Sequence, residues 1–240
     1  GRIYGGGAYG SNKGNTTVTV DGGYFYRNIY GGGQGDLATM TRATIDGNAT
    51  VTLSGAKAAL DSKETTSFIG GLHTVYGGGY MGAGGTGTAS VNVTRGWAGS
   101  DIMETPMWAN AYNPDENGEI NPDRNFCVYG GGYGLDTSVG NTDININIDI
   151  DEDNVILASV GGSFAGEVKN NTSTTIKGMP ILRSVYGGGY GTVNDKQDAA
   201  IVYGNTSLSI EGGKMYCNIY GGGKGIGAKN ATYGNIARVY

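Results

Sequence analysis

Histidine, cysteine and charged residues are all scarce in this chain of 240 residues. With a single His, His73, the chain cannot form a His-rich metal site, and no Ser–His–Asp spacing supports a catalytic triad. The two cysteines, Cys127 and Cys217, do not make a disulfide framework. Each stands just before a Tyr-Gly-Gly-Gly motif, several copies apart, so we expect two small buried thiols.

Long apolar runs, a basic charge excess and an initiating Met are also missing. No stretch approaches the ~18 consecutive apolar residues that a membrane-spanning helix needs. A formal net charge of −5 argues against nucleic acid as a partner, because phosphate binding needs a basic surface. No signal peptide is visible, and we expect residues 1–240 to be a segment of a longer or polymerising chain.

Glycine and tyrosine are abundant, with 48 and 17 residues. They recur together as Tyr-Gly-Gly-Gly, preceded each time by Ile or Val. The motif tyrosines are Tyr4, Tyr30, Tyr76, Tyr129, Tyr186 and Tyr220. A degenerate copy, SVGGSFAG at 159–166, has Val160 in the place of the tyrosine. The shortest spacing, 26 residues, separates Tyr4 from Tyr30 and Val160 from Tyr186, which suggests a basic unit with loops inserted elsewhere.

Between the motifs, apolar and small polar residues alternate. The alternating segments are TTVTVDGG at 16–23, ATVTLSG at 49–55, ASVNVTRG at 89–96, DININIDI at 143–150, STTIKG at 173–178 and TSLSIEGG at 206–213. Alternation with period two predicts strands that bury one face. The residues expected to point inward are Val18, Val20, Val51, Leu53, Val91, Val93, Ile144, Ile146, Ile148, Ile176, Leu208 and Ile210. The Thr, Ser, Asn and Asp residues between them are expected to point outward, and no segment has helical periodicity.

A strand, turn, short strand and turn that recur with a period of about 20–50 residues indicate stacked repeats. We therefore predict an all-β fold, a parallel β-solenoid of about seven coils, right-handed by the rule for crossovers between parallel strands. Residues 1–240 would form one solenoid segment, with a loop insertion at 95–126. A β-propeller is the alternative, but its four-stranded blades need roughly 40–50 residues each.

The triglycines are predicted to be the structural turns of each coil, where positive φ and close approach of neighbouring coils both favour glycine. These turn residues are Gly31, Gly32, Gly33, Gly77, Gly78, Gly79, Gly130, Gly131, Gly132, Gly187, Gly188, Gly189, Gly221, Gly222 and Gly223. Because an inward Ile or Val precedes each motif tyrosine, alternation points the tyrosine outward unless the turn rotates it inward. Outward rings would suit a glycan or a lateral contact. Inward rings would be corner packing, which we favour because repeated apolar positions are usually structural.

The motif [IV]-Y-G-G-G with a following T-x-V/I-x-V/I-x-G-G strand resembles the YGGG-repeat surface proteins of Bacteroidota and related bacteria, which are grouped loosely with adhesin and autotransporter β-helices. The resemblance covers nearly the whole chain except 95–125. It implies a structural role at the cell surface or outside the cell, as a stalk, adhesin or fibre subunit. The degenerate copy at 159–166 departs from the pattern and would interrupt any tyrosine-based site.

We accordingly predict an extracellular structural repeat protein that is not an enzyme. The first and last coils of such a solenoid leave unpaired strand edges, which need a cap or a neighbour. The expected partner is therefore the protein itself, associating end to end or laterally.

The longest interruption, residues 95–126, carries both tryptophans, and loops that break a repeat often carry function. Trp97, Trp108 and Tyr112 are candidates for stacking on a sugar ring or for covering the flank of the solenoid. Oxygen-bearing side chains at alternate positions are the candidate Ca²⁺ ligands: Asp115, Asn117, Glu119, Asn121 and Asp123. Phe126 stands where a calcium loop needs a bidentate Glu, which favours an ordinary acidic turn without a cofactor.

Two other functions compete with the structural one. A carbohydrate-binding or polysaccharide-cleaving β-helix would use the tyrosines or loop 95–126, and Asp149 and Asp151 could supply paired carboxylates. No matching acids recur on neighbouring coils, so a solvated strand end is the simpler interpretation of this pair. An ice-binding solenoid would use Thr-x-Thr ladders such as Thr17 and Thr19. These ladders drift to Ser and Asn, and hydrogen bonds between strands account for them without a ligand.

The chain also contains several Asn-x-Ser/Thr sequons, at Asn15, Asn48, Asn92, Asn170, Asn171, Asn205 and Asn230. A chain rich in Asn and Thr produces such sequons by chance, and glycosylation is only a chemical option for them.

Overall fold

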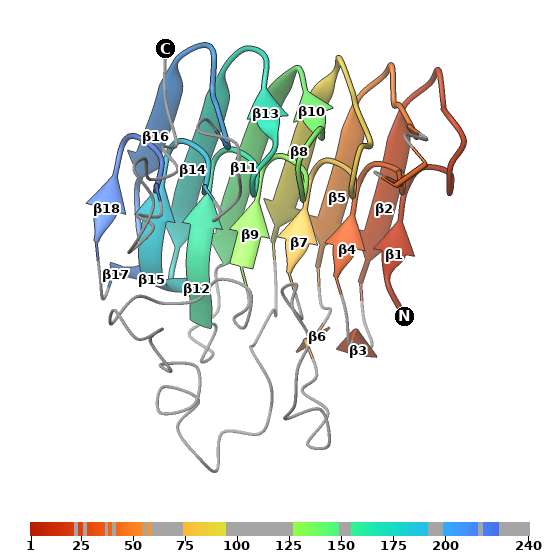
Figure 1. Ribbon diagram of the computed structural model, residues 1–240. Coiled ribbons are helices and arrows are strands. Elements are labelled where there is room, and N and C mark those ends of the chain that lie inside the picture. Colours follow the sequence, from red (N-terminus) through yellow and green to blue (C-terminus); the bar gives the residue numbers. More distant parts are fainter. Residues whose placement is uncertain are drawn as a thin grey trace, which may run out of the picture.

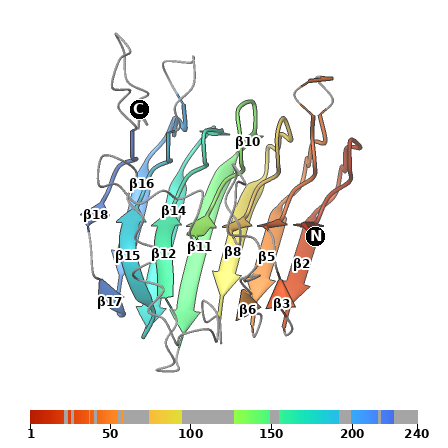
Figure 2. The same ribbon diagram turned by 60° about the horizontal axis from the view of Figure 1, so that its bottom comes forward.

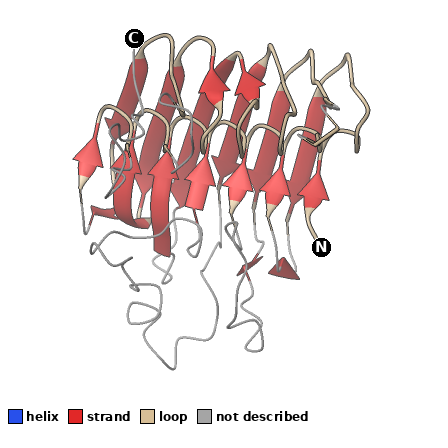
Figure 3. Ribbon diagram, viewed as in Figure 1, coloured by secondary structure: helices blue, strands red, loops and turns tan. Residues whose placement is uncertain are grey.

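The computed structural model consists of strands and connecting turns. It describes residues 1–21, 24–25, 28–36, 38–39, 42–54, 57–58, 74–94, 127–148, 155–191, 199–215 and 218–225. Within these ranges there is no helix (Figure 3). The strands are β1 (Ile3–Tyr4), β2 (Thr16–Val20), β3 (Tyr24–Phe25), β4 (Ile29–Tyr30), β5 (Ala49–Leu53), β6 (Lys57–Ala58), β7 (Val75–Tyr76), β8 (Thr88–Val93), β9 (Cys127–Tyr129), β10 (Ser138–Val139), β11 (Asn141–Ile148), β12 (Val155–Val160), β13 (Glu167–Val168), β14 (Thr172–Gly178), β15 (Ile181–Tyr186), β16 (Thr206–Ile210), β17 (Lys214–Met215) and β18 (Ile219–Tyr220).

Two long sheets of parallel strands form most of the described structure, and two short parallel pairs, β3-β6 and β10-β13, accompany them. One long sheet has the order β1-β4-β7-β9-β12-β15, with both β17 and β18 pairing with β15. The other has the order β2-β5-β8-β11-β14-β16. Figure 1 shows them as a front and a back layer, each passing in chain order from red to blue, and Figure 2 shows the same succession after a rotation. The all-β, parallel part of the predicted fold is therefore confirmed.

The register of the sheets aligns equivalent positions of successive repeats. Ile3 pairs with Ile29 and Tyr4 with Tyr30, and Tyr76 pairs with Tyr129 although 53 residues separate them in the chain. Insertions of different length between the motifs therefore leave the pairing register unchanged. None of the described segments forms a helix with the length and apolar character needed to cross a membrane.

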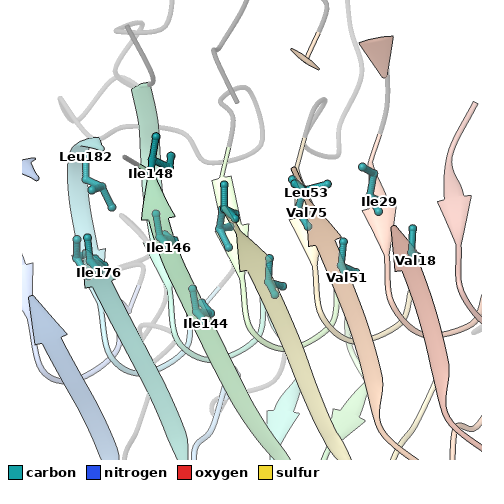
Figure 4. Close-up of a cluster of buried hydrophobic side chains, with 14 residues drawn as sticks. Val18, Ile29, Val51, Leu53, Val75, Ile144, Ile146, Ile148, Ile176 and Leu182 are labelled. Carbon is teal, nitrogen blue, oxygen red and sulfur yellow. The ribbon is translucent and has the colours of Figure 1, made fainter. Parts of the chain in front are cut away.

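The aliphatic core lies between the two sheets. It is a cluster of Val, Ile and Leu to which both sheets contribute, for example Val51 from β5 and Ile29 from β4. Figure 4 shows these side chains following one another along successive strands. The predicted inward residues of the internal strands are buried. Ile210 is 36% exposed, because β16 is the last described strand of its sheet.

The triglycines lie where backbones of successive repeats come closest. A Cβ added to Gly31 would lie closer than 3.0 Å to the carbonyl oxygen of Gly77, and one added to Gly77 would meet that of Gly130 in the same way. Real Cβ atoms essentially never approach another atom so closely, so these turns have no room for a side chain.

The predicted need for positive φ at the triglycines is wrong. Among the described residues, the glycines with left-handed φ are Gly82, Gly134, Gly178 and Gly213, and none of them belongs to a triglycine. The physical reason for Gly at the motif is therefore the close approach of neighbouring backbones, not an unusual backbone conformation.

Gly77→Ala is expected to destabilise the fold by about 1–3 kcal/mol or more, because its methyl group would force two repeats apart. Gly84→Ala is the matched control, since its Cβ would lie 3.4 Å from Ser138 Oγ and 3.7 Å from Thr44 Cγ2, which are ordinary contacts. Urea unfolding followed by circular dichroism measures both variants. Equal midpoints for the two would contradict the close-approach explanation.

Candidate functional site

The four internal motif tyrosines are buried: Tyr30, Tyr76, Tyr129 and Tyr186 are 0%, 2%, 1% and 7% exposed. Each belongs to a second cluster, distinct from the aliphatic core that takes the preceding Ile or Val. Adjacent strand residues point to opposite faces, so alternation holds and the rings are nevertheless covered. These four rings are therefore packed inside the protein, and they offer no open face to a glycan or a lateral partner.

The tyrosine row, as we call the motif tyrosines together with Val160, is a series of parallel ring stacks. The ring centroids of Tyr4 and Tyr30 are 5.0 Å apart, those of Tyr30 and Tyr76 4.9 Å, and those of Tyr76 and Tyr129 5.0 Å. Aromatic pairs in such contact contribute about 0.5–1.5 kcal/mol each beyond burial. At the last repeat, Tyr220 stacks on Tyr186 at 5.2 Å but remains 44% exposed.

A second aromatic row covers the first, and the sequence analysis missed it. It consists of Tyr80, Tyr133, Phe164 and Tyr190, each four residues after a member of the tyrosine row. Tyr80 meets Tyr30 edge-on with centroids 5.4 Å apart, and Tyr133 meets Tyr76 at 5.7 Å. The signal was present in the sequence, where YGGGY occurs at 76–80, 129–133 and 186–190.

The degenerate motif interrupts only the first row. Val160 pairs with Tyr129 on one side and Tyr186 on the other, and it is fully buried. In the second row, Phe164 stacks on Tyr133 at 5.0 Å and on Tyr190 at 5.9 Å. The aromatic cluster is therefore continuous through this repeat.

Asparagine and threonine side chains add a third kind of contact between repeats. Asn48 N donates to Asn15 Oδ1 at 2.8 Å, and Asn205 N donates to Asn171 Oδ1 at 2.8 Å. Asn15, Asn48 and Asn171 each begin a sequon, and their side-chain oxygens accept hydrogen bonds from backbone N–H groups of the next repeat, which gives these three asparagines a structural role. Thr hydroxyls also tie the two sheets together at the glycine turns. Thr16, Thr172 and Thr206 donate to the carbonyl oxygens of Gly31, Gly187 and Gly221 at 2.7, 2.6 and 2.6 Å.

The outer face of the β2-β5-β8-β11-β14-β16 sheet carries two rows of short polar side chains in register. They are Thr17, Thr50, Ser90, Asp143, Ser173 and Ser207, and Thr19, Thr52, Asn92, Asn145, Thr175 and Ser209. These side chains are exposed or half-buried, as alternation predicts. Asp143 breaks the first row, so the hydroxyl ladder considered for ice binding is discontinuous.

Several predicted site residues lie outside the described part of the chain. They are Trp97, Trp108, Tyr112, Asp115, Asn117, Glu119, Asn121 and Asp123 of loop 95–126, together with His73, Asp149, Asp151 and Cys217. Of the two cysteines, Cys127 is described and is buried. Among the described residues, no three His, Cys, Asp or Glu side chains come together as metal ligands. A cavity between the glycine turns Gly32–Gly33 and Gly78–Gly79 has about 10 Å³, enough for one water molecule at most.

In comparisons with known proteins, no family model, curated protein or solved structure matches this chain.

The two ends of the sheets remain as the candidate functional site. The N-terminal edge, β1 and β2 with the turn at Gly5–Gly6, lies at the red end of Figure 1. The C-terminal edge, β16 and β18 with the turn at Gly221–Gly222, lies at the blue end. Apolar side chains that are buried in internal repeats are exposed there: Ile3 is 36% exposed and Ile219 47%, compared with 0% for Ile29. Among the described residues, both edges therefore carry exposed groups of the kind by which internal repeats pack.

Burial of Tyr30 has a consequence at high pH. Burial raises the pKa of the Tyr30 hydroxyl well above its ordinary value, and the hydrogen bond from Asn28 Nδ2, 3.0 Å away, opposes this only in part. Because the pKa is higher in the folded than in the unfolded chain, the stabilisation is complete below about pH 10 and is lost as the pH rises above that value.

We expect the free energy of unfolding to fall above about pH 10, by up to about 1.4 kcal/mol per pH unit through Tyr30. Urea unfolding between about pH 8 and pH 11, with tyrosinate absorbance recorded in parallel, measures this. Tyr30→Phe is expected to show a shallower decline than the wild type. Full ionisation of all tyrosines while the fold persists would contradict the assignment.

Proposed function

We propose that this chain is a right-handed parallel β-solenoid that serves as a non-catalytic structural element outside the cell, a subunit of a stalk, adhesin or fibre. The chain order supports the solenoid. Strands of the two sheets alternate along the chain, and each strand of a long sheet pairs in parallel with its counterpart in the next described repeat, β15 pairing with both β17 and β18. The connections then wind in one direction around the aliphatic core, giving about seven coils, and crossovers between parallel strands are right-handed by general rule.

One observation supports the structural role. The residues that recur in every repeat make their contacts with the next repeat. The triglycines allow backbones to touch, the motif tyrosines stack on one another, and the Asn residues bond to the next Asn. Repeat proteins of this kind derive stability from nearest-neighbour contacts, which suits them to extended scaffolds. The extracellular location is supported by the resemblance of the Tyr-Gly-Gly-Gly motif to bacterial surface proteins.

Removal of one complete unit tests the stacked architecture. Deleting residues 160–185, a unit of 26 residues, joins Ser159 to Tyr186, and Tyr186 already occupies the register position of Val160. We expect a cooperatively unfolding β protein with a continuous tyrosine row. Deleting residues 173–185, half of that unit, should abolish cooperative unfolding because it places non-equivalent residues side by side. Circular dichroism and urea unfolding compare the two, and equal tolerance of both deletions would argue against stacked coils.

The proposed location is tested on cells that produce the protein. Antibodies against the purified chain should label the outside of intact cells in immunogold electron micrographs, and externally added protease should remove that label. A matched sample of permeabilised cells controls for antibody access. Label found only after permeabilisation would contradict an extracellular role.

A further inference from the structure

Met81 lies at a backbone position that most repeats fill with glycine. It follows Tyr76 by five residues and has a left-handed φ of 42°. A residue with a Cβ is strained in this region, which glycine enters freely. The equivalent residues of the other repeats are Tyr9, Gly35, Gly134, Ala165, Gly191 and Gly225. Methionine is therefore a costly residue at position 81, and its side-chain contacts have to offset that cost.

The Met81 side chain packs across the junction between the repeat of β7 and the repeat of β9. A Cβ added to Gly134 would lie 2.7 Å from the Met81 Sδ and 3.6 Å from its Cγ and Cε, so the thioether lies directly over that glycine. The Met81 N–H donates to Tyr133 O at 2.9 Å and ties the backbones together at the same place. The side chain is half-buried and packs against the aromatic cluster, where polarisable sulfur makes favourable contacts with rings.

The other described methionines have different surroundings. Met179 is 47% exposed and belongs to none of the clusters of buried side chains. Met215 packs against the aliphatic core. Within the described part of the chain, Met81 is thus the methionine that supports the aromatic cluster. Three methionines lie outside the described residues: Met40, Met103 and Met107.

We propose that Met81 is a site of reversible oxidation, at which hydrogen peroxide converts the thioether to a sulfoxide and loosens the aromatic cluster between the two repeats. The sulfur gains one oxygen atom and gives up two electrons, and the peroxide leaves as water. A reductase for methionine sulfoxide reverses the change at the expense of two thiols, which leave as a disulfide while the oxygen leaves as water.

Oxidation at Met81 removes the contact that offsets the backbone strain. A sulfoxide is polar and carries an additional oxygen, whereas the sulfur already lies against the backbone of Gly134 on one side and packs against aromatic side chains. The sulfoxide is therefore more stable in water than in this contact, while the left-handed backbone at position 81 remains strained. Both effects act in the same direction and weaken the junction.

Peroxide treatment of the purified chain tests the proposal. Peptide mass spectrometry measures the sulfoxide at each methionine, and near-UV circular dichroism of the tyrosines reports aromatic packing. We expect sulfoxide at Met81, a smaller near-UV signal and, in urea unfolding, a folding equilibrium constant lower by on the order of tenfold. Methionine sulfoxide reductases supplied with a dithiol should restore the signal.

Substitutions assign the effect to one sulfur. Met81→Leu keeps an apolar side chain that peroxide does not oxidise, and Met81→Gly installs the residue found at most equivalent positions. Both variants should keep their near-UV signal under peroxide. Met179→Leu is the matched control at an exposed position and should respond like the wild type. Met215→Leu, which changes a contact of the aliphatic core, should also retain the near-UV response.

Three results would overturn the proposal. The first is an unoxidised Met81 at a peroxide concentration that fully oxidises Met179, which would show that the sulfur is sealed from the reagent. The second is Met81 sulfoxide with an unchanged near-UV signal. The third is a loss of signal that persists in both Met81→Leu and Met81→Gly. All three leave the proposed structural role untouched, because the deletion of residues 160–185 tests that role separately.

Discussion

The close approach of backbones at the triglycine turns is the constraint on which the remaining structure depends. Because these turns have no side chain, the carbonyl oxygen of each glycine can lie directly against the equivalent glycine of the preceding repeat, as Gly77 O lies against Gly31. That spacing brings the motif tyrosines to 4.9–5.2 Å between ring centroids, and it holds the backbone hydrogen bonds of the turns near 3 Å. A side chain at the turn would separate all of these contacts together.

In the aromatic cluster, the motif tyrosines are buried because rings of the second aromatic row cover them. Alternation places each motif tyrosine on the face away from the aliphatic core, where a ring would ordinarily be open to solvent. The second-row ring of the following repeat covers it, as Tyr80, four residues after Tyr76, does over Tyr30. At the degenerate copy the loss of a ring at Val160 is offset by Phe164, which stacks with both neighbours of its own row. The burial is thus a property of two rows together.

Every internal repeat is packed on both sides, whereas the first and last described repeats expose the same groups on one side. Exposed apolar residues at both edges follow directly from this, as at Ile3 and Ile219.

By itself, the sequence determined the strands, their inward faces and the repeating unit. Those features depend on period-two alternation and on the spacing of a local motif, both readable along the chain, as at Val51 and Leu53. Only the tertiary structure decided that the tyrosines are covered and that glycine is needed at the triglycines because neighbouring backbones come close, not because φ is positive. It also decided that Asn48 N donates a hydrogen bond to Asn15 Oδ1. Each of these depends on atoms supplied by a neighbouring repeat, which no single stretch of sequence contains.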